Sequence, residues 1–166
     1  MKLLVTNEYR FHGDQEGRVW SPGQFTYSYF TRYLDVFDHV IVAARIRQEG
    51  TRLDGWQRAD GPGVSFAAIP SYVGPMQFAI RAYSAKQSIR PAVHAADAVI
   101  FRAPGILSDL AEWEMRRAHR PYALEVVTDP HDIFARGVVD HPFRPFFRAY
   151  SAHQLRGQCR TACAGP

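Results

Sequence analysis

The sequence predicts an α/β fold with a mostly parallel, doubly wound sheet and helices on both of its faces. Short apolar segments alternate with helix-length segments along all 166 residues, and parallel strands need crossovers of that length. The segment 40–44 is continuously apolar and rich in β-branched residues, as a strand buried on both faces is. Together these observations predict a Rossmann-like arrangement of parallel strands.

The first part of the chain is expected to contain a strand, a loop and a helix. Residues 2–6 are mostly apolar and are bounded by Asn7, which predicts a buried strand. The stretch 7–20 is polar and contains glycines, so we expect a loop. A serine, a proline and a glutamine within Ser21–Gln24 form a capping box, which predicts a helix over 21–34.

Strands and helices then alternate along the chain. The polar segment 45–63, with its two Asp-Gly turn signals, separates the strand at 40–44 from the next one. On a helix over 76–94, Ile80, Tyr83, Ile89 and Val93 are expected to face the sheet. On a helix over 106–119, Trp113 is expected to point inward. Further strands are predicted at 64–69, 98–102 and 122–127, and a further helix at 142–155.

The chain is expected to end on a strand, Cys159–Ala164, with no helix after it. A parallel strand needs a crossover segment to cover its face. A sheet of about six strands that ends in this way indicates one lobe of a two-lobed protein. Residues 1–166 are therefore expected to form an N-terminal domain whose partner lobe is absent. Cys159 and Cys163 are expected to be reduced and buried.

Composition and charge restrict the partners and the location. Apolar residues make up 46% and charged residues 22%, which is typical of a soluble globular protein. A net charge of +4 is too small to indicate nucleic-acid binding, and it suits an anionic small molecule or an anionic lipid surface. No apolar stretch approaches the roughly 20 residues of a membrane span, and no signal peptide is recognisable. We expect a cytoplasmic protein, with a peripheral position at the inner face of the membrane as an alternative.

The predicted loop after the first strand holds three candidate binding residues. Ligands of parallel sheets bind at the carboxyl ends of the strands. Gly13 and Gly17 lie there, but they enclose Asp14 and Glu16, whose charges would repel a phosphate. No dinucleotide-binding fingerprint or P-loop occurs, which argues against a flavodoxin-like nucleotide-binding regulator. Arg18 is a candidate for contact with an anionic or polyhydroxylated ligand, and the alternative is a solvated loop arginine.

Two further groups of candidates follow later strands. Asp129 and Asp132 flank His131, and this cluster can orient sugar hydroxyls or transfer protons. The alternative is that an aspartate caps the next turn. Arg102, at the end of the fourth predicted strand, is either a ligand contact or a structural ion-pair partner. No metal site and no cofactor are expected, because two cysteines alone lack partner ligands.

The segment 143–156 alternates aromatic residues with arginines. Rings at the headgroups and arginines on phosphates would suit a membrane surface. The alternative is that the rings pack onto the sheet, as aromatic residues at helical spacing usually do.

A series of short stretches gives the chain a family resemblance. They are Asn7-Glu8-Tyr9-Arg10-Phe11, Val19-Trp20, Arg32-Tyr33-Leu34-Asp35, Ala59-Asp60-Gly61-Pro62-Gly63, Tyr72-Val73-Gly74-Pro75, Ala96-Asp97-Ala98, Glu125-Val126-Val127-Thr128-Asp129-Pro130 and His141-Pro142-Phe143-Arg144. In this order and spacing, the chain resembles the N-terminal, acceptor-side domain of retaining glycosyltransferases of family 4, which have the GT-B fold.

The resemblance implies an enzyme of two Rossmann-like lobes that moves a sugar from a nucleotide-sugar donor to an acceptor with retained configuration. The missing lobe would hold the donor, and this lobe would bind a sugar or glycolipid acceptor. The loop near Gly13 and Gly17 would contribute, and His131 is the nearest match to a histidine of the family. The fragment alone is expected to be inactive and to self-associate through its exposed lobe interface. The alternative is a stand-alone α/β binding or interaction module.

Overall fold

The computed structural model describes residues 1–49, 54–135, 137–138 and 141–162. In these ranges the chain forms an α/β fold around a mixed, partly parallel seven-stranded sheet. The strands are β1 Lys2–Gly13, β2 Val19–Ser21, β3 His39–Gln48, β4 Gln57–Arg58, β5 Val64–Pro70, β6 Ala98–Ala103 and β7 Ala123–Val126. The helices are α1 Tyr27–Thr31, α2 Gly74–Ala95, α3 Ile106–Arg117, α4 Pro130–Ile133 and α5 Arg144–Thr161.

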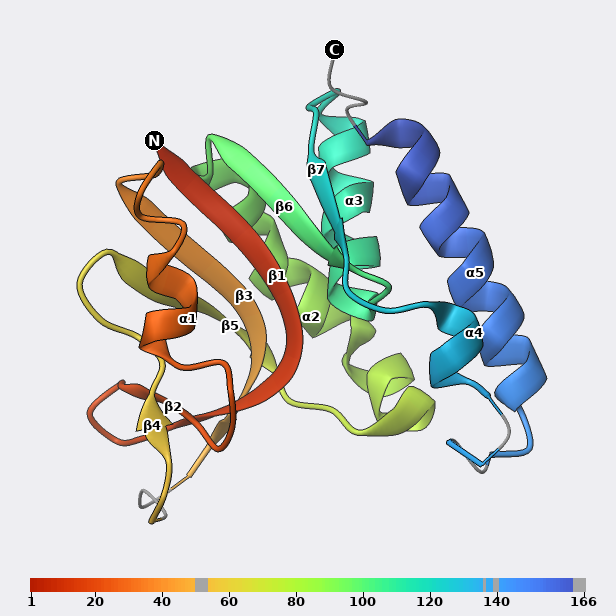
Figure 1. Cartoon of the computed structure of the whole chain (residues 1–166), viewed down its shortest axis with the longest axis horizontal. Coiled ribbons are helices and arrows are strands. Elements are labelled where there is room, and N and C mark those ends of the chain that lie inside the picture. Colours follow the sequence, from red (N-terminus) through yellow and green to blue (C-terminus); the bar gives the residue numbers. More distant parts are fainter. Residues whose placement is uncertain (50–53, 136, 139–140, 163–166) are drawn as a thin grey trace.

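The first strand lies in the middle of the sheet (Figure 1). It pairs in parallel with β3 on one side and with β6 on the other, and β5 and β7 extend the two sides in parallel. The parallel strands therefore follow the order β5-β3-β1-β6-β7. The far end of β1 pairs antiparallel with β2, which pairs antiparallel with β4. The predicted α/β class is confirmed.

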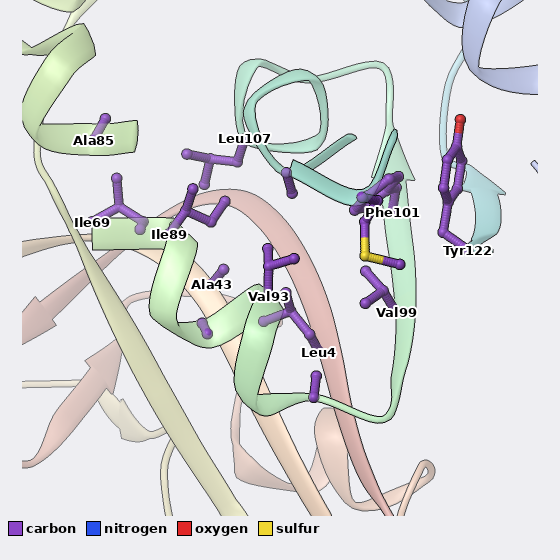
Figure 2. Close-up of a cluster of buried hydrophobic side chains, with 14 residues drawn as sticks. Leu4, Ala43, Ile69, Ala85, Ile89, Val93, Val99, Phe101, Leu107 and Tyr122 are labelled. Carbon is purple, nitrogen blue, oxygen red and sulfur yellow. The ribbon is translucent and has the colours of Figure 1, made fainter. Parts of the chain in front are cut away.

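Both faces of the sheet are buried because side chains alternate along each strand. Leu4 of β1 packs with residues of α2 and α3, together with Phe101 of β6 (Figure 2). Its neighbours Leu3 and Val5 point to the other face, where they pack with Phe30 of α1. The helices α2 and α3 thus cover one face, and α1 with its flanking aromatic residues covers the other (Figure 1).

The predicted loop at 7–20 is wrong, since β1 continues to Gly13 and β2 begins at Val19. Phe11 is fully buried in the core, and residues 10–13 pair with β3, as expected of a strand rather than of a loop. The capping box at Ser21 does not form a helix start. Ser21 ends β2, and its hydroxyl accepts a hydrogen bond from the Gly23 N–H at 3.3 Å. Pairing of β2 with β4 holds Ser21 in an extended backbone, and α1 begins only at Tyr27.

The predicted helices α2 and α3 are confirmed, as is a helix after residue 142, but three of the residues expected to face inward on α2 and α3 are exposed. Ile80 and Tyr83 are 79% and 75% exposed, whereas Ile89 and Val93 are fully buried. The first turns of α2 extend past the sheet edge, so only its second half packs on the sheet (Figure 1). Trp113 of α3 is 42% exposed. Its ring is covered by the Lys86 ammonium, which lies 3.1 Å from the ring centroid, as in a cation–π contact.

The predicted terminal strand is wrong. The helix α5 runs to Thr161, so Cys159 is helical, and it is exposed rather than buried. Cys163 and residues 164–166 lie outside the described residues. The helix is held beside α3, because Gln158 Nε2 donates to Asp109 Oδ1 at 2.9 Å and Thr161 Oγ1 donates to Glu112 Oε1 at 3.1 Å. The chain therefore does not end on the bare strand that indicated a missing lobe.

The aromatic residues of α5 do not pack onto the sheet as a group. Phe146 and Tyr150 are 62% and 45% exposed, and the helix packs against α3 and α4 instead. Among the described residues, no helix is both long enough and apolar enough to cross a membrane.

The burial of Leu4 in β1 and the exposure of Ile80 in α2 predict different effects of mutation on stability. Replacing Leu4 by Ala should lower the free energy of unfolding by about 2–5 kcal/mol, because it leaves a cavity in a close-packed core. Ile80→Ala removes a similar side chain from the surface and should change the free energy of unfolding by less than about 0.5 kcal/mol. Urea denaturation followed by circular dichroism measures both. Equal losses would contradict the burial described for the two positions.

Candidate functional site

The carboxyl ends of β1, β3 and β5 meet at one edge of the sheet, where β1 has a bulge. Asn7 of β1 pairs with Ala44 of β3, and Arg10 pairs with Arg45, so two residues of β1 have no counterpart in β3. These two residues are Glu8 and Tyr9. A bulge of this kind bends the strand and redirects side chains. It turns Glu8 toward the start of α3, next to the neighbouring strand β6.

The Glu8 carboxylate joins three elements of the fold. Its Oε1 accepts a hydrogen bond from the Leu107 N–H of α3 at 2.6 Å, and its Oε2 lies 3.4 Å from Arg45 Nη2 of β3. A Cβ at Gly105 would lie 2.7 Å from Glu8 Cγ, so the close approach requires glycine there. Burial raises the pKa of Glu8, although the Leu107 N–H and Arg45 act in the opposite direction. The carboxylate occupies the helix N-terminus that would otherwise attract an anion.

Arg45 connects Glu8 to a buried tyrosine. Its guanidinium donates to the backbone oxygen atoms of Glu8 and Tyr72 and lies 4.9 Å from the Tyr72 ring centroid. Burial raises the pKa of the Tyr72 hydroxyl. Within the described part of the chain, three buried polar atoms at this edge have no hydrogen-bond partner: Asn7 Nδ2, Arg45 Nε and the Tyr72 hydroxyl. Unpaired buried polar groups are rare and indicate a place for water or a polar ligand.

A cavity of about 410 Å³ opens beside these residues, and its lining includes Glu8, Arg10, His12 and Arg45. His12 Nδ1 lies 3.3 Å from Glu49 Oε1, and its ring stacks on Trp56 at 4.0 Å between centroids. When Nδ1 donates to the carboxylate, Nε2 is left as a hydrogen-bond acceptor. The cavity thus combines an imidazole, a carboxylate and two guanidinium groups. This set suits a ligand that carries hydroxyl groups.

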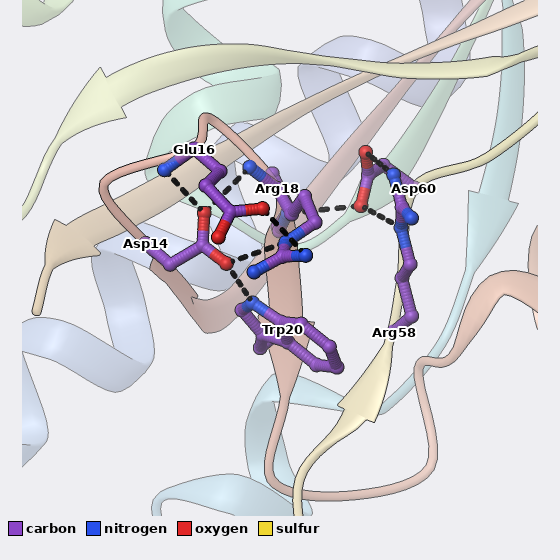
Figure 3. A network of polar contacts seen from close by, with 7 residues as sticks. Asp14, Glu16, Arg18, Trp20, Arg58 and Asp60 are labelled. Carbon is purple, nitrogen blue, oxygen red and sulfur yellow. Dashed lines mark hydrogen bonds and ion pairs between the residues drawn. The ribbon is translucent and has the colours of Figure 1, made fainter. Parts of the chain in front are cut away.

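The first three predicted site residues lie on the β1–β2 hairpin. Gly13 ends β1, and Gly17 is in the turn with a φ of 77° that favours glycine. Arg18 is engaged within the hairpin (Figure 3), because its Nε donates to Asp14 Oδ2 at 2.8 Å and its Nη1 lies 2.6 Å from Glu16 Oε2. Burial alone would raise the pKa of Asp14, but hydrogen bonds from Trp20 and Arg18 hold it well below its usual range.

Arg102 has a carboxylate partner across the sheet edge. Its Nε donates to Glu125 Oε2 of β7 at 3.1 Å, and its guanidinium lies over the rings of Phe25 and Tyr29. The Glu125 carboxylate also receives a hydrogen bond from the Tyr33 hydroxyl at 3.3 Å. The structure therefore contains the ion pair that was the alternative interpretation of Arg102.

The cluster Asp129, His131 and Asp132 forms the start of the short helix α4. The Asp129 side chain accepts a hydrogen bond from the His131 N–H at 2.7 Å, so this aspartate caps the helix. Asp132 lies in the first turn of α4 and is exposed. In the described residues, no hydrogen bond or ion pair joins this cluster to Arg102 or to the hairpin residues. A ligand-binding role for any of these residues stays a prediction.

Sequence reasoning missed the residues of the cavity. Glu8, His12 and Arg45 lie in stretches that were expected to be loops, and they are placed by the length of β1 and β3. One signal was available, since Tyr9 and Phe11 alternate with polar residues as in a half-buried strand. Across the described ranges, no group of three or more His, Cys, Asp or Glu side chains is arranged to hold a metal ion.

Comparison with known proteins gives one distant relative. The chain is 24% identical to Protein CapJ of Staphylococcus aureus over 136 residues, which are 81% of this chain and 34% of CapJ. It therefore spans much less than the full length of the curated relative that it matches. No family model and no solved structure matches the chain.

A second carboxylate near Glu8 gives the protein a pH-dependent stability. Burial, with a smaller effect from the Glu112 and Glu8 carboxylates, raises the pKa of Asp109 in α3 from 3.8 to about 7. Between these values the folded chain holds a proton that the unfolded chain releases, so stability must fall as the pH rises through this window.

We therefore expect the wild-type protein to lose roughly 1–4 kcal/mol of stability between pH 4 and pH 7 because of Asp109. In Asp109→Asn this loss should disappear, since an amide does not ionise, while the Gln158 contact can be kept. Urea denaturation of both proteins at several pH values measures the difference. Parallel pH profiles for the two proteins would show that Asp109 does not have a raised pKa.

Proposed function

We propose that this chain is the acceptor-binding lobe of a glycosyltransferase that acts in capsule biosynthesis. The observation that carries the proposal is the cavity whose lining includes Glu8, His12 and Arg45, in the second half of β1 and of β3. A site lined by an imidazole, a carboxylate and guanidinium groups matches the hydrogen-bonding needs of a saccharide. The distant similarity to CapJ, a capsule biosynthesis protein, supports the same process.

The order of the parallel strands supports a Rossmann-like lobe. From β1 the chain adds β3 and β5 on one side and then β6 and β7 on the other. Doubly wound sheets share this strand order, and they bind ligands where the direction of winding reverses. The reversal lies between β1 and β6, next to the contact between Glu8 and Leu107. Because a carboxylate already occupies the start of α3, this position disfavours a nucleotide phosphate, which fits an acceptor-side lobe.

The cavity also supports a role in acceptor orientation. An acceptor hydroxyl can donate to His12 Nε2, while Glu49 holds the ring through Nδ1. Arg45 and Arg10 can donate to hydroxyl oxygens. The resemblance to family 4 glycosyltransferases suggests that a second lobe would hold the donor sugar and its diphosphate.

Exposed apolar residues favour this proposal over a stand-alone binding module. Val73 and Met76 follow β5, and Val126 and Val127 end or follow β7, so all four belong to the carboxyl edge. They are 53%, 76%, 53% and 42% exposed. Exposed apolar side chains at one edge are typical of a surface that another domain covers. A second lobe, or a second copy of this chain, would bury them there.

Binding of saccharides tests the cavity directly. We expect the chain to bind members of a panel of bacterial capsular oligosaccharides on a glycan array. His12→Ala should weaken the binding about tenfold, as loss of a hydrogen bond to a buried polar ligand does. His153→Ala is the matched control, since His153 is an exposed histidine on α5. Equal effects of the two variants, or no binding to any saccharide, would overturn the proposed site.

An assay of sugar transfer tests whether catalysis requires a second lobe. The chain alone, mixed with nucleotide-sugars and an oligosaccharide that it binds, should release no nucleoside diphosphate above the rate without protein. The reason is that stabilising a departing diphosphate requires positioned donors, which the second lobe would supply. A coupled assay for nucleoside diphosphate measures this. Transfer by the chain alone would contradict the one-lobe proposal and support a self-contained enzyme.

A further inference from the structure

A second cavity lies between α4 and α5, and its polar lining is entirely basic or imidazole. Its volume is about 440 Å³, and its polar lining residues are His131, Arg144, Arg148 and Arg156. The small side chains of Ala149 and Ala152 also line it, which leaves space between the arginines. Within the described part of the chain, no carboxylate lines this cavity.

The arginines of this cavity differ from most others of the protein. Several arginines elsewhere, among them Arg18, Arg45 and Arg102, lie within 4 Å of a carboxylate oxygen. No such partner is found among the described residues for Arg144, Arg148 or Arg156. Three cations on one helix, with no carboxylate partner among the residues that the structure describes, repel one another, which costs stability unless an anion joins them. This arrangement indicates a binding site rather than a structural ion-pair network.

The contact between Arg148 and His131 determines which nitrogen of the imidazole ring can donate a hydrogen bond. Arg148 Nε donates to His131 Nδ1 at 3.0 Å, and Arg148 Nη2 also contacts this nitrogen. A ring that accepts at Nδ1 carries its proton on Nε2, so the imidazole is a donor at its other nitrogen. Arg144 lies one turn from Arg148, about 6 Å along the helix. The cavity therefore offers donors from several directions.

We propose that this cavity binds the phosphate group of a ligand, whether a soluble phosphate compound or a phospholipid headgroup carries it. A tetrahedral phosphate presents oxygen atoms in several directions and accepts bidentate hydrogen bonds from arginine. A planar carboxylate presents fewer. The fork of Arg144, the N–H groups at the end of the Arg148 guanidinium that do not contact His131, and the Nε2–H of His131 form the centre of the site. Arg156 extends it along α5. The proposal is independent of saccharide binding at the Glu8 cavity.

Titration with inorganic pyrophosphate tests the site in the whole chain. The ring signals of His131, followed by NMR, should shift in a saturable way, and glucuronate should bind much more weakly. Arg148→Gln and Arg144→Gln should each weaken binding about tenfold. Arg160→Gln is the matched control, because it removes the same charge from the same helix and Arg160 does not line the cavity. It should change binding less than about twofold. Circular dichroism checks that each variant is folded.

Sedimentation with vesicles separates the two sources of phosphate. Phosphatidylcholine vesicles with and without phosphatidylglycerol are compared for the wild-type chain, Arg148→Gln and Arg160→Gln. Pyrophosphate binding without vesicle binding supports a soluble ligand, and vesicle binding that Arg148→Gln removes supports a headgroup. Equal losses in Arg148→Gln and Arg160→Gln would show a non-specific effect of charge and overturn the site. Glucuronate binding as tight as pyrophosphate, or no binding of either probe, would also overturn it.

Discussion

The structure depends on the position of β1, which is buried on both faces and paired on both sides. Leu4 on one face and Leu3 and Val5 on the other are fully buried, so the strand cannot shift by one residue without exposing a core. The pairs with β3 and β6 fix its register. The strand contacts β2, β3, β6, α2 and α3, and the two hydrophobic clusters lie on its opposite faces.

The same strand also creates the candidate acceptor site. Beyond Asn7 a bulge interrupts the pairing with β3, and Glu8 leaves the ladder to contact the start of α3 and Arg45. A carboxylate at a helix N-terminus is stabilised by the backbone N–H groups there. This contact joins β3 to the start of α3 across β1. It also places a carboxylate in the lining of the Glu8 cavity, unlike the basic cavity between α4 and α5.

The two cavities differ in the charge of the side chains that line them. The Glu8 cavity mixes donors and acceptors, which suits neutral hydroxyl groups, whereas the cavity between α4 and α5 presents only donors from its polar lining. They lie on different elements, since the Glu8 cavity is lined by β1 and β3, whereas the basic cavity is lined by α4 and α5, which follow β7.

The sequence by itself determined the α/β class, most of the parallel strands and the helices α2, α3 and α5, because continuous apolar segments and helical spacing are local patterns. It did not determine how far β1 and β3 extend, where α1 begins or that Cys159 is helical. Those features depend on partners distant in the chain: β2 and β4 hold Ser21 extended, and Asp109 and Glu112 hold α5. Glu8, His12 and Arg45 became neighbours only through the bulge and the strand pairing. Tertiary structure therefore decided the site, since long-range pairing outweighs local propensity.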